Sequence, residues 1–330
     1  MLTDSENDIQ MSQEEFIMIR DFIHDKSGIF FAENKMYLVK NRLHKRMSEL
    51  GIKSIRDYFY HVKYDVSLKE FHQLMNLVTT NETSFFRNEP QLLSFAEEVL
   101  PQIIKAKTEA KAPKTLKLWS AGCSSGEEPY TLAMILLEKM LPATGWNVEI
   151  LANDISENVL QKARKGEYTG ITLRNIKSNV LNKYFTKTDD IYRVNPNVKA
   201  LVKFFHMNLN EARRMTMMSG IDVIFFRNVM IYFSEEVKKQ IIRGFYNTLN
   251  PGGYLFIGHS ETLHGLSKAF KLVYFKNALV YNKEAVAAGS ENAGSSRPAS
   301  TAARSAGDAA TGASRALDLL SKIKPMAVKK

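Results

Sequence analysis

The sequence predicts an α/β protein whose parallel, doubly wound sheet is preceded by a small all-α unit, and three observations support this fold class. From Leu116 onward, short apolar segments alternate with segments of helical periodicity, which is typical of a parallel sheet with helices on both faces. The first apolar segment runs into the glycine- and serine-rich turn AGCSSG, a feature of ligand-binding sheets. Residues 12–80 show helical patterns only.

The helical unit contains two patterns that mark helix starts. Ser12 with Glu15 and Ser67 with Glu70 have the spacing of a capping box, and apolar residues recur at helical spacing after each pair. We therefore expect a helix to begin at each of these two pairs.

The α/β part is expected to alternate between strands and helices. The segments that carry this alternation are, in order, TLKLW, EEPYTLAMILLEKML, NVEILA, SENVLQKARK, DVIFF, SEEVKKQIIRGFYNTL and GYLFIG. Between Tyr168 and Phe204 the chain loses this rhythm. We expect a small helical and hairpin insertion there.

Composition and charge limit the class of protein. The chain has 330 residues, of which 45 are Lys or Arg and 35 are Asp or Glu, so its formal charge is +10. This surplus first suggests an anionic partner such as nucleic acid, but it lies mainly in residues 89–283, whereas residues 1–88 carry 12 basic and 13 acidic groups. A single cysteine, Cys123, excludes an intrachain disulfide and fits a reducing compartment such as the cytoplasm. The most apolar run, Ile221–Phe233, is too short to span a membrane, so no membrane insertion is expected.

Residues 284–330 differ in composition from the rest of the chain. They include 13 alanines and no aromatic residue, which leaves too little apolar surface to offset the entropy of ordering the backbone. We expect a disordered, Ala/Ser/Gly-rich tail. The helical spacing of Leu317, Leu320 and Ile323 offers a short docking helix as the alternative.

Two acidic residues, Glu127 and Glu128, follow the glycine-rich turn and open the next predicted helix. These charges would repel a dinucleotide pyrophosphate at the helix N-terminus, whereas they suit the cationic amino group of a methionyl ligand. The chain also lacks the G-x-G-x-x-G pattern of a nicotinamide-dependent dehydrogenase at this turn. The turn by itself is weak evidence, since an ordinary strand–helix connection also contains glycine.

Further polar side chains stand where predicted strands end, and parallel strands end at one edge of a sheet. Asp154 ends the second strand and is placed to accept both ribose hydroxyls of an adenosine; its alternative role is the N-cap of the next helix, which Ser156 can also fill. Asn208 follows the third strand and can hold an adenine amine, although it also suits a plain turn. Arg227 directly follows the segment DVIFF, and the end of a buried strand rarely carries arginine without a functional reason.

A polar cluster, TTNETSFFRN at residues 79–88, separates the helical unit from the α/β part. It combines hydroxyls, amides and one arginine around two aromatic residues, which fits a cleft at a domain junction. The alternative is an interdomain linker with capping residues.

Five motifs, in this order and spacing, resemble the CheR-type chemotaxis-receptor glutamate methyltransferases: TTNETSFFRN, SAGCSSGEEPYTLA, ANDIS, FFRNVMIYF and LNPGGYLFIGHSE. The resemblance covers about residues 10–283. It implies a Rossmann-like class I methyltransferase sheet with a small inserted β-subdomain, preceded by an all-α N-terminal domain. It also implies methyl transfer from S-adenosylmethionine to glutamate side chains of receptor cytoplasmic helices in chemotaxis adaptation, with S-adenosylhomocysteine as the product.

Composition and the resemblance together predict a division of the chain into three parts. Residues 1–88 would form a receptor-docking domain, residues 89–283 the methyltransferase domain with an insertion at about 168–204, and residues 284–330 the tail. Family members that tether to a receptor's C-terminal pentapeptide have a glycine-containing loop in the inserted subdomain. The hairpin FTKTDDIY, residues 185–192, has no glycine, so pentapeptide tethering is not expected.

The resemblance also implies site residues, motif by motif. Tyr232 would lie near the transferred methyl. A bidentate arginine clamp would weaken the attacking carboxylate, so we hypothesise that Arg87 or Arg227 holds the cofactor's carboxylate or only one substrate oxygen. These three residues are the candidate catalytic residues. The cofactor site would be lined by Asn81, Thr83, Arg87, one of Glu127 and Glu128, Asp154, Asn208, Leu209, Phe226 and Arg227. Neither a general base nor a metal is expected, because a carboxylate with a pKa of about 4.3 is already ionised at neutral pH and the seven histidines show no ligand spacing.

Four basic residues, Lys35, Arg42, Lys45 and Arg46, fall on one side of a predicted helix. A solvated basic face is the simple alternative, but in the family the corresponding helix faces the acidic methylation region of the receptor coiled coil. We expect a monomeric cytoplasmic enzyme that is recruited to receptor arrays at the inner membrane; the receptor of a non-motility pathway is the alternative substrate. Nucleic acid is not expected as a partner, because the Asn/Asp-Pro-Pro-aromatic motif of enzymes that methylate its amino groups is absent where Arg227-Asn-Val-Met stands.

Overall fold

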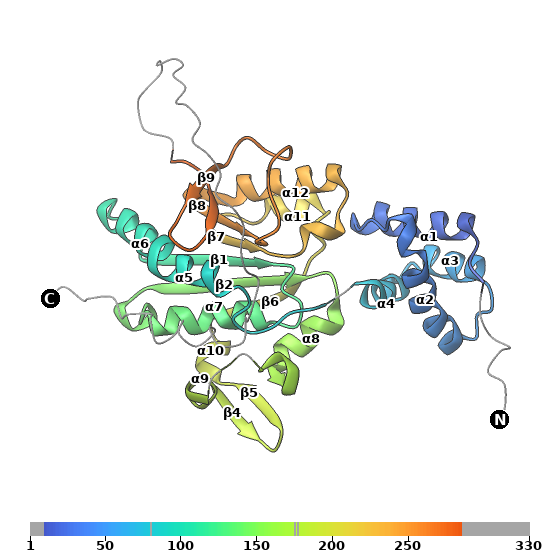
Figure 1. Ribbon diagram of the computed structural model, residues 1–330, viewed down its shortest axis with the longest axis horizontal. Coiled ribbons are helices and arrows are strands. Elements are labelled where there is room, and N and C mark those ends of the chain that lie inside the picture. The colour runs from blue at the N-terminus through green and yellow to red at the C-terminus, as the bar shows by residue number, and fades with distance from the viewer. Residues whose placement is uncertain (1–9, 80, 175, 177, 286–330) are drawn as a thin grey trace, which may run out of the picture.

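The N-terminal part of the computed structural model is a helical domain, as the sequence predicts (Figure 1). The structure describes residues 10–79, 81–174, 176 and 178–285. The helical domain contains α1 (Gln13–Ser27), α2 (Met36–Leu50), α3 (Ile55–Lys63) and α4 (Lys69–Val78). Their apolar faces, including Phe16, Val39, Leu43, Tyr58 and Leu74, enclose a core of their own. Most of the predicted tail lies outside the described residues, which end at residue 285.

Of the two predicted capping boxes, one is confirmed and the other is wrong. Ser12 Oγ accepts the N–H of Glu15 at 3.2 Å, and Glu15 Oε2 accepts the N–H of Ser12 at 2.9 Å. Before α4, however, it is Asp65 whose carboxylate accepts the N–H of Glu70, at 2.7 Å. The Glu70 side chain turns into the domain instead, where it accepts hydrogen bonds from Arg46 and Tyr58. Glu70 does not complete the capping box because its side chain makes these hydrogen bonds inside the domain.

The second domain is built on a seven-stranded sheet that confirms the predicted α/β fold. Its strands are β1 (Thr115–Ala121), β2 (Asn147–Asp154), β6 (Val202–His206), β7 (Ile221–Phe226), β8 (Leu249–Ile257), β9 (Lys271–Tyr274) and β10 (Leu279–Asn282). They are ordered β6-β2-β1-β7-β8-β10-β9, and the first five are parallel. After β1 the chain adds β2 and then β6 on one side of that strand. It then crosses to the other side of β1, where it adds β7 and β8. The point between β1 and β7 is where such sheets bind ligands, outside the carboxyl ends of the strands.

Helices cover both faces of this sheet (Figure 1). One face packs against α5 (Glu89–Ser94), the π-helical turn Phe95–Val99, α6 (Leu100–Glu109) and α7 (Glu127–Glu138). The other face packs against α11 (Ala212–Thr216) and α12 (Glu235–Thr248). Successive side chains of β1 point to opposite faces of the sheet. Leu118 therefore packs in the core on the first face and Trp119 in the core on the second.

The predicted insertion is present between α8 (Glu157–Lys165) and β6. It contains a three-stranded antiparallel sheet of β3 (Glu167–Tyr168), β5 (Ile191–Val194) and β4 (Phe185–Thr188), with the helices α9 (Ser178–Tyr184) and α10 (Pro196–Lys199). The main sheet resumes at Val202, where β6 pairs with β2, so the insertion ends slightly before residue 204.

Candidate active site

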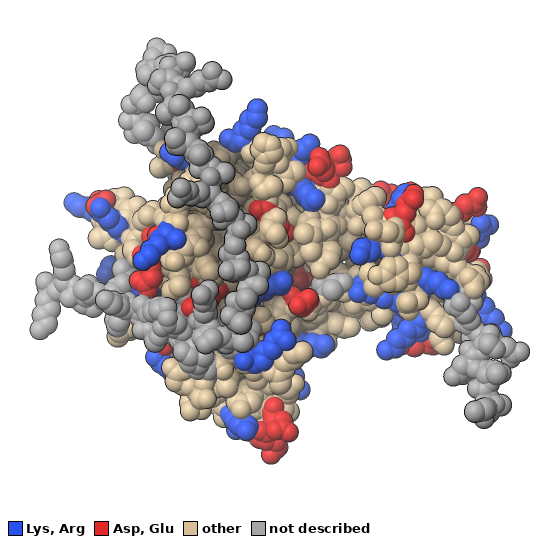
Figure 2. Space-filling model, in the orientation of Figure 1, with Lys and Arg blue, Asp and Glu red and all other residues tan. Residues whose placement is uncertain are grey.

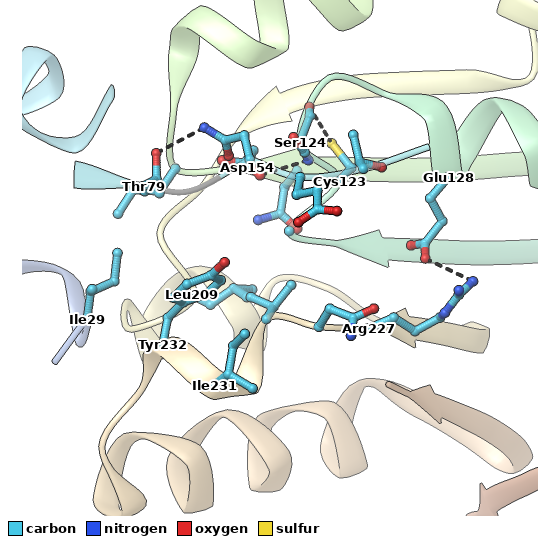
Figure 3. A pocket seen from close by; sticks show the side chains of 18 of the residues that line it. Ile29, Thr79, Cys123, Ser124, Glu128, Asp154, Leu209, Arg227, Ile231 and Tyr232 are labelled. Carbon is cyan, nitrogen blue, oxygen red and sulfur yellow. Dashed lines mark hydrogen bonds and ion pairs between the residues drawn. The ribbon is translucent and has the colours of Figure 1, made fainter. Parts of the chain in front are cut away.

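A cavity lies between the helical domain and the carboxyl edge of the sheet (Figure 3). The ends of β1, β2, β6 and β7 form one wall, and Ile29, Val78 and Thr79 of the helical domain contribute to the other. The predicted site residues that line the cavity are Asn81, Thr83, Arg87, Glu128, Asp154, Asn208, Leu209, Arg227 and Tyr232. The fold thus brings together nine of the predicted positions at the switch point of the sheet.

The turn after β1 is held against the end of β2. The N–H groups of Gly122 and Cys123 both donate to the carbonyl of Asn153, at 2.9 and 2.8 Å. Ser124 has a positive φ of 50° and donates its N–H to Asp154 Oδ2 at 2.9 Å. Its buried hydroxyl has no partner among the described residues. The turn therefore presents backbone and one hydroxyl to the cavity in a conformation that the end of β2 maintains.

Substitution of Gly122 by alanine is expected to destabilise this turn. Gly122 has a φ of +76°, and a Cβ there would lie 2.7 Å from Val229 Cγ2. A left-handed residue other than glycine costs roughly 1–2 kcal/mol, and the overlap adds to that cost. Gly220→Ala is the matched control, because Gly220 has a φ of +71° with nothing within 4 Å. Urea unfolding should show a larger loss for Gly122→Ala; equal losses would contradict the close approach.

Asp154 is buried at the end of β2, and both carboxylate oxygens are oriented by backbone. Oδ1 accepts the N–H of Ser156 and Oδ2 that of Ser124, each at 2.9 Å. Burial raises the pKa of this carboxyl group, and these hydrogen bonds oppose the rise. Ser156 is the N-cap of α8, since its Oγ accepts from the N–H of Val159. Asp154 is therefore not needed as the cap, and each of its oxygens keeps a lone pair for a ligand hydroxyl.

Arg227 and Glu128 form an ion pair across the cavity (Figure 3), with 3.4 Å between Nη1 and Oε2. Ser120 Oγ donates to the other oxygen of Glu128 at 2.7 Å, and Nη2 of Arg227 donates to the carbonyl of Arg87. Burial lowers the pKa of Arg227, and its buried Nε has no acceptor among the described residues. A guanidinium N–H without an acceptor suits a carboxylate, and Glu128 suits an ammonium group. These residues therefore fit both charges of a methionyl ligand.

Two predicted cofactor residues do not line the cavity, and these assignments are corrected. Glu127 is fully buried beside the turn, where both its oxygens accept from Ser125 Oγ at 2.8 and 3.0 Å, and burial raises its pKa. Successive helix residues point about 100° apart, so Glu128 alone faces the cavity. Phe226 is fully buried against Phe245 under α12, because successive strand residues point to opposite faces.

Asn208 lines the cavity, but its side chain also joins the two domains. Nδ2 donates to the carbonyl of Lys26 at 2.8 Å, and Oδ1 accepts the N–H of Asn210 at 3.0 Å. Two further side-chain contacts join the domains: Ser234 Oγ lies 3.0 Å from His24 Nε2, and Ser156 Oγ donates to Asn76 Oδ1 at 2.7 Å. A role of Asn208 towards an adenine amine stays a prediction.

Tyr232 and Arg87 both line the cavity. Tyr232 ends the 3-10 turn Met230–Tyr232, and its carbonyl accepts the N–H of Phe30 at 2.8 Å. Burial raises the pKa of its phenol. Arg87 donates from Nη1 to the carbonyl of Glu82 at 2.9 Å. Ile29 is a cavity residue that the sequence analysis missed, because its place depends on a β-bridge to Phe233 more than 200 residues away.

The predicted basic face of α2 is smaller than the sequence suggests. Arg46 is engaged within the domain, with Nη2 2.7 Å from Glu70 Oε2 and Nη1 3.0 Å from Glu49 Oε2. Arg42 donates to the carbonyl of Val78, and burial lowers its pKa. Lys35 and Lys45 are exposed, and Figure 2 shows Lys and Arg side chains gathered over the region of α2. Both arginines therefore have contacts within the domain, and docking through them stays a prediction.

Two features are absent from the described residues. No group of three or more His, Cys, Asp or Glu side chains among them is arranged to hold a metal ion. Within the same part of the chain, no helix has both the length and the apolar character needed to cross a membrane.

Comparison with known proteins agrees with the fold and the motifs. Residues 14–79 match the family model described as "CheR methyltransferase, all-alpha domain", and residues 81–279 match "CheR methyltransferase, SAM binding domain". Chemotaxis protein methyltransferase 2 of Vibrio cholerae is 36% identical over 273 residues, which cover 82% of this chain and 93% of that protein. Chemotaxis protein methyltransferase 1 of Pseudomonas aeruginosa is 36% identical over 265 residues, covering 78% and 94%. The chemotaxis protein methyltransferase of Escherichia coli is 34% identical over 269 residues, covering 80% and 90%. With both of its described domains matched in order and the five motifs within them, this chain belongs to the CheR methyltransferase family.

Proposed function

We propose that this protein transfers a methyl group from S-adenosylmethionine to glutamate side chains on the cytoplasmic helices of chemoreceptors, which yields glutamate methyl esters and S-adenosylhomocysteine. One observation carries the proposal: buried Asp154 and the Arg227–Glu128 pair line one cavity at the switch point of the sheet. The first suits a ribose, and the pair suits the amino and carboxylate groups of a methionyl chain.

The chemistry requires little from the protein beyond placement. When bound, the cofactor supplies a methyl group on a positively charged sulfur. A substrate carboxylate is ionised at neutral pH and needs no general base. Its oxygen would form the new bond to the methyl carbon as the carbon–sulfur bond breaks, and the electron pair of the broken bond would stay on sulfur. Charge is neutralised in this step, so a site with little water favours it. Holding the reacting atoms in line contributes roughly 7–11 kcal/mol.

The lining residues divide into two proposed groups. Asn81, Thr83, Glu128, Asp154, Asn208 and Leu209 are proposed to hold the cofactor, together with Arg87 and Arg227. Tyr232 is proposed to lie at the methyl-transfer end, with Arg87 beside it at the domain junction. Arg87 and Arg227 should bind the cofactor's carboxylate or only one substrate oxygen, because a bidentate clamp would weaken the attacking carboxylate. We propose that no metal takes part.

The domains are proposed to have separate tasks. The helical domain, residues 1–88, would dock on the acidic methylation region of the receptor coiled coil through exposed Lys35 and Lys45 of the α2 region, and residues 89–283 would carry out the transfer. The enzyme is proposed to act as a cytoplasmic monomer recruited to receptor arrays at the inner membrane, without nucleic acid and without pentapeptide tethering.

Reversal of the two exposed lysines is expected to weaken receptor methylation. Lys35→Glu combined with Lys45→Glu should lower the methylation rate about tenfold at low salt and less at high salt, because exposed charges mainly steer association and are screened. Binding of S-adenosylhomocysteine should be unchanged. Lys111→Glu with Lys114→Glu alters the net charge equally on exposed residues that precede β1, whereas the cavity lies at the other end of that strand, and should have no effect. Equal loss in both double variants would contradict docking through α2.

The proposed function is tested by incubating the protein with labelled S-adenosylmethionine and receptor-bearing membranes. Label should enter the receptor as a methyl ester that alkali releases. Alkali-stable label would indicate N-methylation, and label in added nucleic acid would identify a different substrate class.

A further inference from the structure

Glu261 joins the loops that follow two neighbouring strands, β7 and β8. Its Oε2 accepts the N–H of Gly258, directly after β8, at 2.6 Å. The same oxygen accepts the N–H of Asn228, which follows β7, at 3.1 Å. Phe226 and Ile257, the last residues of the two strands, are register partners. One carboxylate therefore holds together the exits of two parallel strands.

The exit of β7 needs such support because its backbone is unusual. Asn228 has a φ of +60°, which for a non-glycine residue requires surrounding contacts to maintain it. The 3-10 turn Met230–Tyr232 follows immediately. Burial raises the pKa of the Glu261 carboxyl group, and the backbone N–H groups around it oppose that rise, first those of Gly258 and Asn228 and then those of Met230 and Ile231. The carboxylate thus sits at the N-terminus of the turn that carries Tyr232.

Glu261 acts from outside the cofactor cavity. It lines a second cleft, which shares Arg87 and Asn228 with the first, and it does not line the cavity itself. A Cβ on Gly258 would lie 2.7 Å from Glu261 Oε2, so the carboxylate is packed tightly against the loop after β8. Its other oxygen is buried without a partner among the described residues. Glu261 therefore contacts the loops after β7 and β8 and not the interior of the cavity.

We propose that Glu261 is a positioning residue for methyl transfer, which fixes the segment from Asn228 to Tyr232 so that the substrate carboxylate and the methyl group stay in line. This inference rests on the proposed function. Removal of the carboxylate would leave the N–H of Asn228 unpaired and allow the loop to relax, and a displacement of about 1 Å can reduce turnover about 100-fold. Asp154 belongs to the exit of β2, and Arg227 keeps its contacts with Glu128 and with the carbonyl of Arg87, so both should continue to bind the cofactor.

The test compares Glu261→Ala, Glu261→Gln and Glu98→Ala in the full chain with a receptor substrate. Glu98 is the matched control, because it too is partly buried, has one oxygen on a backbone N–H (Lys276, at 3.0 Å) and one buried oxygen without a partner among the described residues, yet lines neither cavity. Glu261→Ala should lower kcat 10- to 100-fold while the KM for S-adenosylmethionine and the Kd for S-adenosylhomocysteine change less than threefold. Glu261→Gln keeps an acceptor oxygen and should recover at least a third of kcat, and Glu98→Ala should match wild type.

Hydrogen exchange provides a readout that does not depend on turnover. The amides of residues 228–231 should exchange faster in Glu261→Ala and remain unchanged in Glu98→Ala. The proposal would be overturned by a wild-type kcat in Glu261→Ala or by unchanged exchange in that segment. It would also be overturned if kcat, cofactor affinity and Tm all fell together and glutamine restored none of them. The proposed function fails separately, when wild-type protein forms no base-labile ester on the receptor.

Discussion

Replacing Asp154 by alanine is expected to weaken binding of S-adenosylhomocysteine about 100-fold or more. The carboxylate is only 7% exposed and lines the cavity with both oxygens oriented by backbone N–H groups. A hydrogen bond to a charged group is worth about 1.5–3 kcal/mol, so two lost bonds to a ribose amount to about 3 kcal/mol or more, and each 1.4 kcal/mol is a factor of ten. Calorimetric titration measures the loss directly.

Asp154→Asn and Asp222→Asn make this prediction specific. Asp154→Asn retains one acceptor oxygen and should give an intermediate affinity. Asp222 is a second buried aspartate of the same sheet, but it lies in β7 away from the cavity and binds Lys107 Nζ at 2.7 Å. Asp222→Asn should lower Tm and leave the Kd for S-adenosylhomocysteine within twofold. Tight binding by Asp154→Ala would remove Asp154 from the cofactor site.

Arg227→Ala is expected to reduce kcat/KM for methylation about 100-fold or more. The substitution leaves Glu128 without its cation and removes the donor of the hydrogen bond to the Arg87 carbonyl. Removing one partner of a buried ion pair typically costs 3–5 kcal/mol, and the wall of the cavity also loses the N–H proposed to bind the cofactor's carboxylate. Arg227→Lys keeps the charge but not the planar set of donors, so only partial recovery is expected.

The controls for Arg227 separate its role from a general effect of arginine removal. Arg243→Ala, on the exposed side of α12, should match wild type in turnover and in cofactor affinity. Arg87→Ala should also lower turnover, by less, because Arg87 is partly exposed and its guanidinium donates to the Glu82 carbonyl. If Arg87→Ala and Arg227→Ala both kept wild-type turnover and cofactor affinity, the assignment of both arginines would be wrong.

Local pattern was sufficient for the order of elements and for the edge of the sheet where the site lies. Apolar strands alternate with helices along the chain, and the carboxyl ends of parallel strands meet at one edge. The sequence therefore predicts that Asp154, Asn208 and Arg227 lie together, and all three line the cavity. The sequence leaves open whether Asp154 or Ser156 caps the helix that follows β2. The structure shows that Ser156 is the cap.

Side-chain direction and long-range pairing were decided only by the tertiary structure. Glu127 and Glu128 are equivalent as sequence, and the rotation of α7 against the sheet determines that Glu128 faces the cavity. The helical pattern of α2 predicts a basic face, but Arg46 meets Glu70 from α4, 24 residues away. The sequence by itself determined the family, the fold class and the location of the site, because these depend on periodicity and motif order. Packing decided which charges face a ligand, because a buried charge takes whichever partner the fold brings within hydrogen-bonding distance.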